Sequence, residues 1–204
     1  MALKFIPRLA VHKKLALLQQ FSIIELFTEP PLLSNIALTE KQYQALISPD
    51  WHRIDSIIEG VKSLDGNIIP FDHADYPQKL KEIYDPPLVL FVKGDFTVLN
   101  RPQFAIVGSR NVSVHGRETA YRFAGELSEQ GIVVTSGLAL GVDAHAHKGV
   151  VDNKSATIGV IATGIDNCYP ARHKNLVKEI IKNGGAIVSE FLPNTPPKSG
   201  HFPK

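Results

Sequence analysis

The spacing of hydrophobic residues in the first third of the chain is helical. Apolar side chains recur at intervals of three and four residues, almost without strand-like alternation, in 13–21, 23–27, 40–47 and 51–64. Thr39 stands where an N-cap is expected before the third of these helices. We therefore expect a small all-helical domain over residues 1–65, with Phe21, Phe27 and Trp51 in its core.

From Gly66 onward the pattern changes to short apolar runs that alternate with amphipathic stretches. The runs predict strands at 67–71, 88–93, 104–109, 132–136, 157–162 and 186–190. Helices are predicted at 76–84 and at 114–130, the second ended by Gly131. The last four strands recur about every 30 residues, the length of a βαβ unit. We expect an α/β domain over 66–204, with a mostly parallel sheet and flanking helices.

The composition is typical of a soluble globular protein. Of the 204 residues, 44% are hydrophobic, and no apolar run approaches the roughly 18 residues that a membrane helix needs. The N-terminal segment carries charges where a signal peptide would be apolar. We therefore expect a cytoplasmic protein without membrane contact. Cys168 is the only cysteine, which excludes an intrachain disulfide and a metal site built from cysteines.

Positive charge is concentrated toward the end of the chain. The net charge is only +2, which argues against a wholly basic nucleic-acid binder. Within residues 166–204, however, basic residues outnumber acidic ones by six to three. The excess produces a local positive field or, as the alternative, only a solvated helix face.

Small and hydroxyl residues gather where the first two predicted parallel strands end. The small and hydroxyl residues are Gly108, Ser109, Ser136, Gly137 and Gly141, and two charged residues, Arg110 and Asp143, stand among them. Ligands of open parallel sheets bind beyond the carboxyl ends of the strands. Glycines let a ligand approach the backbone, and the Arg110 guanidinium and the free N–H groups at the start of helix 114–130 would bind a phosphate or another oxyanion. Ordinary turn chemistry is the alternative.

Known nucleotide-binding and catalytic patterns are missing. The sequence has neither the G-x-G-x-x-G fingerprint nor the G-x-x-x-x-G-K-[ST] loop, which disfavours NAD and ATP. Asp143, His145 and His147 form a D-x-H-x-H string, but no third metal ligand is evident, and Asp143 is expected to cap or charge a helix start. Glu190 lacks a partner for acid–base work, and no G-x-S-x-G elbow is present. We predict no catalytic residue, metal or cofactor.

The last twelve or so positions combine prolines with cations and rings. Lys198, His201, Phe202 and Lys204 fall in this tail. Single-stranded nucleic acid requires cations for its phosphates and rings on which its bases stack. The tail therefore favours single-strand binding, with a disordered chain end as the alternative.

Taken in chain order, these blocks resemble the DNA-processing protein A family (DprA, also called Smf). The resemblance runs from about Tyr76 to the last residue. The matching blocks are Tyr76-Pro77, Asp85-Pro86-Pro87, 105–110, Ser136-Gly137-Leu138-Ala139, Gly141-Val142-Asp143-Ala144-His145, Tyr169-Pro170, Ser189-Glu190 and His201-Phe202-Pro203-Lys204.

The resemblance implies a Rossmann-like domain without nucleotide-cofactor chemistry, preceded by a small SAM-like helical domain, in a homodimer. It implies non-catalytic binding of single-stranded DNA and loading of a RecA-type recombinase during DNA uptake in natural transformation. We expect Arg110 to anchor a phosphate, Ser109, Ser136 and Gly137 to offer hydrogen-bond donors, and Phe202 to stack on a base. The resemblance assigns Arg110, Lys198, Phe202 and Lys204 to the DNA pocket. Together with the strand-end residues, the predicted DNA-binding residues are Gly108, Ser109, Arg110, Ser136, Gly137, Gly141, Asp143, Lys198, Phe202 and Lys204.

The chain departs from the family after its Phe-Pro block. The family continues with an Arg-Asn-Arg segment and more sheet, whereas this sequence stops at Lys204. We therefore expect part of the DNA pocket and the dimer and recombinase surfaces to be missing, and DNA binding to be weak. Two alternatives stay open: a nucleotide-cleaving enzyme resembling the phosphoribohydrolases, whose Gly-Gly-x-x-Thr-x-x-Glu block we do not find, and a module that senses a nucleotide through the same pocket.

Overall fold

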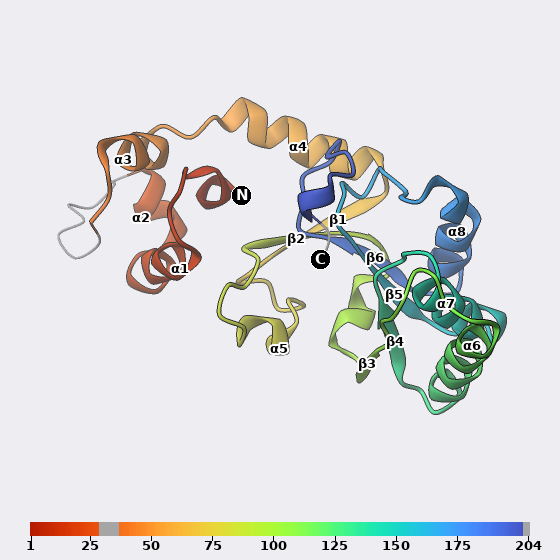
Figure 1. Ribbon diagram of the computed structural model, residues 1–204. Helices are drawn as coiled ribbons and strands as arrows, with labels where there is room; N and C mark the ends of the chain where they lie inside the picture. Colours follow the sequence, from red (N-terminus) through yellow and green to blue (C-terminus); the bar gives the residue numbers. More distant parts are fainter. Residues whose placement is uncertain (29–36, 202–204) are drawn as a thin grey trace.

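The helices of the first third lie together at one end of the molecule (Figure 1). In this computed structural model, which describes residues 1–28 and 37–201, a short 3-10 helix η1 (Ala2–Phe5) precedes α1 (Val11–Gln20), α2 (Ile23–Thr28) and α3 (Glu40–Ile47). The longer α4 (Trp51–Ser63) then leads to the sheet. Each helix lies where the hydrophobic periodicity predicts it.

A capping box and buried leucines fix this helical region. Thr39 Oγ1 accepts a hydrogen bond from Gln42 N (3.4 Å), and Gln42 Oε1 accepts one from Thr39 N (3.0 Å), so the predicted N-cap is confirmed. Leu17, Leu26 and Leu46 are fully buried. These leucines anchor one face of α1, α2 and α3 in a common core.

The prediction that Trp51 is a core residue is wrong. Its side chain is 50% exposed and packs edge to face on Phe27, with ring centroids 5.5 Å apart. Trp51 is the first residue of α4, directly after the N-cap Asp50, where a helix has no preceding turn against which a large ring could pack. Phe21 and Phe27 are partly buried against the core.

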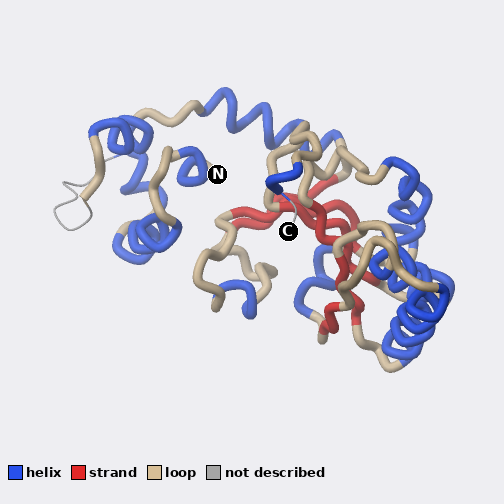
Figure 2. The backbone as a smooth tube through the Cα atoms, in the orientation of Figure 1, coloured by secondary structure: helices blue, strands red, loops and turns tan. Residues whose placement is uncertain are grey.

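The strands form one six-stranded sheet in the order β1-β2-β6-β5-β4-β3 (Figure 2). Their bounds are β1 Gly66–Pro70, β2 Val89–Gly94, β3 Gln103–Ala105, β4 Val133–Ser136, β5 Thr157–Ile161 and β6 Ala186–Ser189. Strands β3 to β6 pair in parallel, whereas β1 pairs with β2 and β2 with β6 in antiparallel fashion. The predicted mostly parallel sheet is confirmed.

Helices α6 (Val114–Glu129), α7 (Val142–Asp152) and α8 (Lys174–Lys182) cover one face of this sheet. Buried Val134 of β4 packs there with α6 and α7, and buried Ile187 of β6 packs with α8. The other face is covered by the segment between β1 and β3, which contains α5 (Gln78–Lys81) and η2 (Phe96–Asn100). Two further 3-10 helices are η3 (Ala171–His173) and η4 (Ser199–His201).

Two predicted elements are shorter than expected. The helix predicted at 76–84 is reduced to α5, because Tyr76 is buried as an anchor whose hydroxyl donates to Pro87 O (2.7 Å), and Tyr84 at the other end is 93% exposed. The strand predicted at 104–109 ends at Ala105, apart from one further bond from Ile106 N to Thr135 O (3.0 Å). Within the described residues the pairing with β4 ends at this bond, and the chain turns at Gly108-Ser109-Arg110.

The helical region and the sheet share buried contacts. Leu17 and Leu46 belong to the same apolar cluster as Val89 and Phe91 of β2. The division of the chain at residues 65 and 66 therefore stays a prediction. Among the described residues, no helix combines the length and the hydropathy that a membrane span requires.

Candidate nucleic-acid interface

A hollow of about 960 Å³ lies on the sheet at the carboxyl ends of β3, β4 and β5. Residues paired across parallel strands point to the same face, and Ala105 of β3 pairs with Thr135 of β4. Both line the hollow, together with Val160 of β5, which is 46% exposed although β5 is a central strand. The hollow is therefore the part of this sheet face that the segment with α5 and η2 leaves uncovered.

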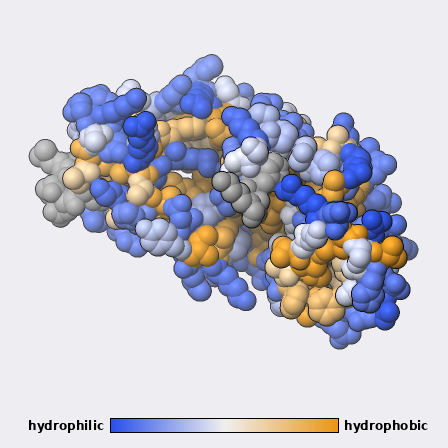
Figure 3. Space-filling view, viewed as in Figure 1, coloured by the Kyte–Doolittle hydropathy of each residue, from blue (hydrophilic) through white to orange (hydrophobic). Residues whose placement is uncertain are grey.

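Apolar residues are visible on the surface around this end of the sheet. Figure 3 shows hydrophobic residues gathered where Figure 1 draws β3, β4 and α6. Phe104 of β3 and Phe123 of α6 are each 45% exposed and pack edge to face, with centroids 5.7 Å apart. Neither ring lines the hollow, so this ring pair is a matched control for rings that do.

The Gly108-Ser109-Arg110 turn is fixed against the start of α7 rather than that of α6. Ser109 O accepts a hydrogen bond from Val142 N, the first residue of α7 (3.2 Å). Gly141 has φ +81, and a Cβ at this position would overlap the Ser109 carbonyl oxygen. The start of α6 lies four residues beyond Arg110 and is capped by Ser113 Oγ, which accepts from Gly116 N (3.1 Å). The Ser113 cap thus occupies one N–H group of the α6 start, and the expected use of this helix start for an anion stays a prediction.

The two serine hydroxyls are committed within the chain. Ser136 Oγ donates to Ile106 O (2.6 Å) and is buried, which ties β4 to the end of β3. Ser109 Oγ donates to Asn111 O (3.0 Å) and accepts from Asn111 N (3.1 Å). Both hydroxyl protons are thus donated within the chain, and the role of these residues toward DNA stays a prediction. Ser136 lines the hollow, and Ser109 holds the turn behind it.

Asp143 has a structural partner at the edge of the hollow. Its carboxylate is buried, and Oδ2 accepts from Ala139 N (3.3 Å), which holds the turn after β4. The N-cap position of α7 is Gly141, so Asp143 does not cap the helix, but it lies in the first turn, where a carboxylate suits the helix dipole. Because Gly137 has no Cβ, this carboxylate can approach it closely: a Cβ there would lie 2.7 Å from Oδ2.

Two walls of different chemistry enclose the hollow. One wall carries the exposed side chain of Arg110. The other carries Glu190, Phe191 and His201, of which the last two stack with ring centroids 4.3 Å apart and an interplanar angle of 21°. His201 Nδ1 also lies 3.3 Å from Ala162 O. A guanidinium and a ring stack thus face one space, which can hold both a phosphate and a base.

Half of the predicted site residues line this hollow. They are Gly108, Arg110, Ser136, Gly137 and Asp143, while Ser109 and Gly141 build the turn behind them. Lys198 is exposed and not part of the lining; its carbonyl accepts from His201 N (2.9 Å). Phe202 and Lys204 lie outside the described residues.

Sequence reasoning missed the ring stack as a unit. The sequence places His201 in the tail and assigns no role to Phe191. The available signal was the position of Phe191 directly after Ser189-Glu190, at the end of the last parallel strand. Contact between these two rings, ten residues apart, depends on how the tail returns over β5, which no local pattern reveals.

The D-x-H-x-H string does not form a metal site. His145 Nδ1 lies 2.8 Å from Gly141 O, and His147 is fully buried where α7 packs on β5. Thr157 Oγ1 donates to Val134 O (2.6 Å), so at 2.9 Å it accepts from His147 Nδ1. Burial lowers the pKa of His147 to about 4, so the ring is neutral. The described part of the chain holds no cluster of three or more His, Cys, Asp or Glu that could bind a metal ion.

The N-terminal segment contacts the same wall of the hollow. Lys4 Nζ donates to Glu190 O (2.9 Å). Burial lowers the pKa of the Lys4 ammonium, and the nearby Glu190 carboxylate opposes that shift. Residues at the start of the chain thus help to hold the end of β6 in place.

Comparisons with known proteins converge on one family. The profile of the family described as DNA recombination-mediator protein A matches residues 67–204. Protein Smf of Escherichia coli is 35% identical over 173 residues, covering 85% of this chain and 46% of the relative. The DNA processing protein DprA of Bacillus subtilis is 34% identical over 177 residues, with 85% and 59% covered. The chain therefore spans about half the length of these curated relatives.

Solved structures show the same similarity. DprA from Streptococcus pneumoniae superposes with a TM-score of 0.78 at 28% identity, covering 98% of this chain and 69% of that one. DprA from Helicobacter pylori, a structure concerned with single-stranded DNA binding, gives a TM-score of 0.60 at 29% identity, with 68% and 61% covered. The α/β fold with its parallel sheet is thus shared with these proteins.

Proposed function

Because the chain belongs to the DNA recombination-mediator protein A family, we propose that it binds single-stranded DNA in the hollow at the carboxyl ends of β3, β4 and β5. The binding is non-catalytic. The bound strand places one phosphate on Arg110 and one base against the Phe191–His201 stack. The Phe191–His201 stack thus offers a base the kind of stacking surface that was expected of Phe202, whose own role stays a prediction.

One observation carries the proposal: a cation and a ring stack line the same hollow. A volume of about 960 Å³ is at the upper end of the roughly 300–1,000 Å³ found for small-molecule sites, which is enough for a nucleotide unit. The floor is apolar through Ala105 and Val160, so it suits a base better than a second phosphate. Stacking tolerates every base, and we expect little sequence preference.

We further propose that the bound strand is delivered to a RecA-type recombinase during natural transformation, by a cytoplasmic homodimer. Family membership supports this part. A hollow that is open on one side binds only a few nucleotides and leaves the rest of the strand available to a filament. The proposal predicts faster recombinase filament assembly on DNA coated with a single-strand-binding protein when the chain is added, and a dimer mass in sedimentation equilibrium.

The ring stack provides the sharpest test of DNA binding in the hollow. Base–aromatic stacking contributes about 1–3 kcal/mol per base, so loss of the platform should weaken binding about 5- to 150-fold. The variant Phe191→Leu/His201→Leu removes both rings, and Phe104→Leu/Phe123→Leu removes the ring pair outside the hollow. Fluorescence anisotropy with a labelled oligothymidylate should show a loss only for the first variant.

Competitors define the substrate class in the same assay. Unlabelled oligothymidylate should displace the probe, whereas duplex DNA of the same length and nucleoside monophosphates should compete poorly. Equal competition by duplex, tight binding of a mononucleotide, or release of free base from a monophosphate would each contradict the proposal. Equal affinity of the two ring variants would remove the stack from the site.

A further inference from the structure

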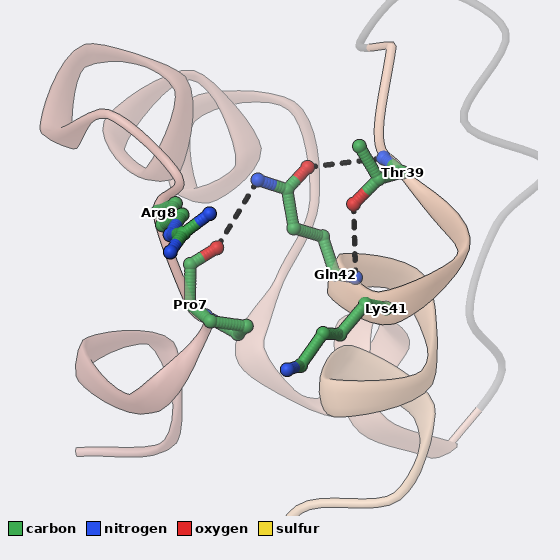
Figure 4. A pocket seen from close by; sticks show the side chains of 5 residues that line it. All are labelled: Pro7, Arg8, Thr39, Lys41 and Gln42. Atoms are coloured by element: carbon green, nitrogen blue, oxygen red, sulfur yellow. Dashed lines mark hydrogen bonds between the residues drawn. The ribbon is translucent and has the colours of Figure 1, made fainter.

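A second hollow, of about 470 Å³, lies in the helical region (Figure 4). It is enclosed by the segment after η1 and by the beginning of α3. Pro7 and Arg8 line it on one side, and Thr39, Lys41 and Gln42 line it on the other. No part of the hollow on the sheet contributes to it.

The Gln42 side chain joins the two sides of this second hollow. Gln42 Nε2 donates to Pro7 O (3.1 Å), and Gln42 Oε1 accepts from Thr39 N (3.0 Å). Gln42 N donates in turn to Thr39 Oγ1 (3.4 Å). These bonds join the Pro7 segment to the start of α3, which lies 35 residues further along the chain. The capping box occupies the Gln42 N–H group. The Gln42 N–H group is therefore not available to a ligand.

Two cations border the second hollow without a counter-charge in its lining. Arg8 and Lys41 are both exposed, and no lining residue is acidic. Among residues 1–28 and 37–201, neither cation has an Asp or Glu oxygen within 4 Å. The neighbouring acid Glu40 accepts from Gln44 Nε2 (2.8 Å), further along the same helix. Figure 4 shows the Lys41 side chain reaching back toward Pro7, with Arg8 on the other side of Pro7.

We propose that Arg8 and Lys41 bind a phosphate group in this second hollow. A guanidinium offers paired donors to phosphate oxygens, and an ammonium adds a mobile point charge, so the two together match one phosphate. The phosphate belongs to the single strand of DNA that also occupies the hollow on the sheet. This identification of the phosphate rests on the proposed function. A strand long enough to reach both hollows makes one additional phosphate contact in the helical region.

The site is tested first without DNA. Pyrophosphate is titrated into the ¹⁵N-labelled chain, and the amide signals of Thr39, Lys41 and Gln42 are followed. We expect saturable shifts in the intact protein and none in Arg8→Ala/Lys41→Ala. Arg122→Ala/Lys182→Ala serves as the control, because it makes the same change in net charge at two exposed side chains elsewhere. Unchanged amide signals in the intact chain would overturn the proposal, whether or not the chain binds DNA.

The source of the phosphate is tested with strands of two lengths. For single strands, log affinity falls with log salt concentration with a slope of about −0.7 per neutralised phosphate. On a long oligothymidylate, Arg8→Ala/Lys41→Ala should make the slope shallower by about 0.7 and weaken binding, while the control keeps the original slope. On an oligonucleotide that fills only the hollow on the sheet, both variants should bind like the intact chain.

The outcomes separate this site from the proposed function. Equal slopes for the long strand, together with intact binding of the short one, would refute the DNA contact and leave the hollow on the sheet as the DNA site. Pyrophosphate shifts without any DNA binding would support the phosphate site, assign it to a free phosphate compound, and reject the proposed function.

Discussion

The buried ring of His147 predicts a specific dependence of stability on pH. Its pKa is lowered from 6.5 to about 4, first because burial disfavours the charged ring. An unfolded chain restores the ordinary value. Between these two values the unfolded state binds a proton that the folded state does not, so the free energy of unfolding falls as the pH falls. The loss begins near pH 6.5 and is complete near pH 4.

The magnitude follows from the width of that interval. A displacement of roughly 2.5 pKa units at 1.36 kcal/mol each amounts to about 3 kcal/mol. Acidic residues titrate in part of the same range, so the effect must be isolated by comparison with a variant that cannot titrate. His147→Gln keeps a donor for Thr157 Oγ1, and His147→Leu fills the space with an apolar side chain.

Urea unfolding followed by circular dichroism, at pH values from about 7 to about 4, measures the effect. The curve of the intact chain should be steeper than those of both variants, with the difference growing to about 3 kcal/mol at the acid end. Each variant will also change stability at neutral pH, which shifts its curve without changing the slope. Parallel curves for all three proteins would refute the argument that His147 is held neutral by burial.

Three other predictions concern stability and DNA binding. Gly141→Ala should lower the free energy of unfolding in urea by about 1–3 kcal/mol, since φ is +81 and a Cβ would overlap the neighbouring turn. Gly131 has φ +76 but open space around it, so Gly131→Ala should lower the free energy of unfolding clearly less. Thr39→Ala removes the capping box and should cost about 1 kcal/mol in thermal unfolding, so an unchanged melting temperature would contradict the assigned cap. Lys4→Met removes the bond to Glu190 O and should weaken DNA binding without altering its salt slope; a shallower slope would instead show that Lys4 touches a phosphate.

Local signals allowed most elements to be predicted from the sequence. Thr39 marks the start of α3, and Gly131, with φ +76, follows the end of α6, because caps and left-handed turns are specified by single residues. The parallel strands could be found because buried strands are short apolar runs at regular spacing. Elements with exposed ends were predicted worst, as the reduction of the 76–84 helix to α5 shows.

The site was predictable only in part. The sequence indicated the strand ends and Arg110, because the carboxyl edge of a parallel sheet is set by topology. The sequence could not show that one face of β3, β4 and β5 stays uncovered, since this depends on strand register and on the path of residues 71–100. Nor could it show that the Ser136 hydroxyl bonds to Ile106 O across two strands.

The central claim is that Arg110 holds a phosphate of single-stranded DNA at the edge of the sheet. The most direct measurement is the salt dependence of oligothymidylate affinity for the intact chain, for Arg110→Ala, and for Arg122→Ala as a variant of equal charge. The account predicts that only Arg110→Ala weakens binding and makes the log–log slope shallower by about 0.7, the share of one phosphate. Identical affinities and slopes for all three proteins would contradict it.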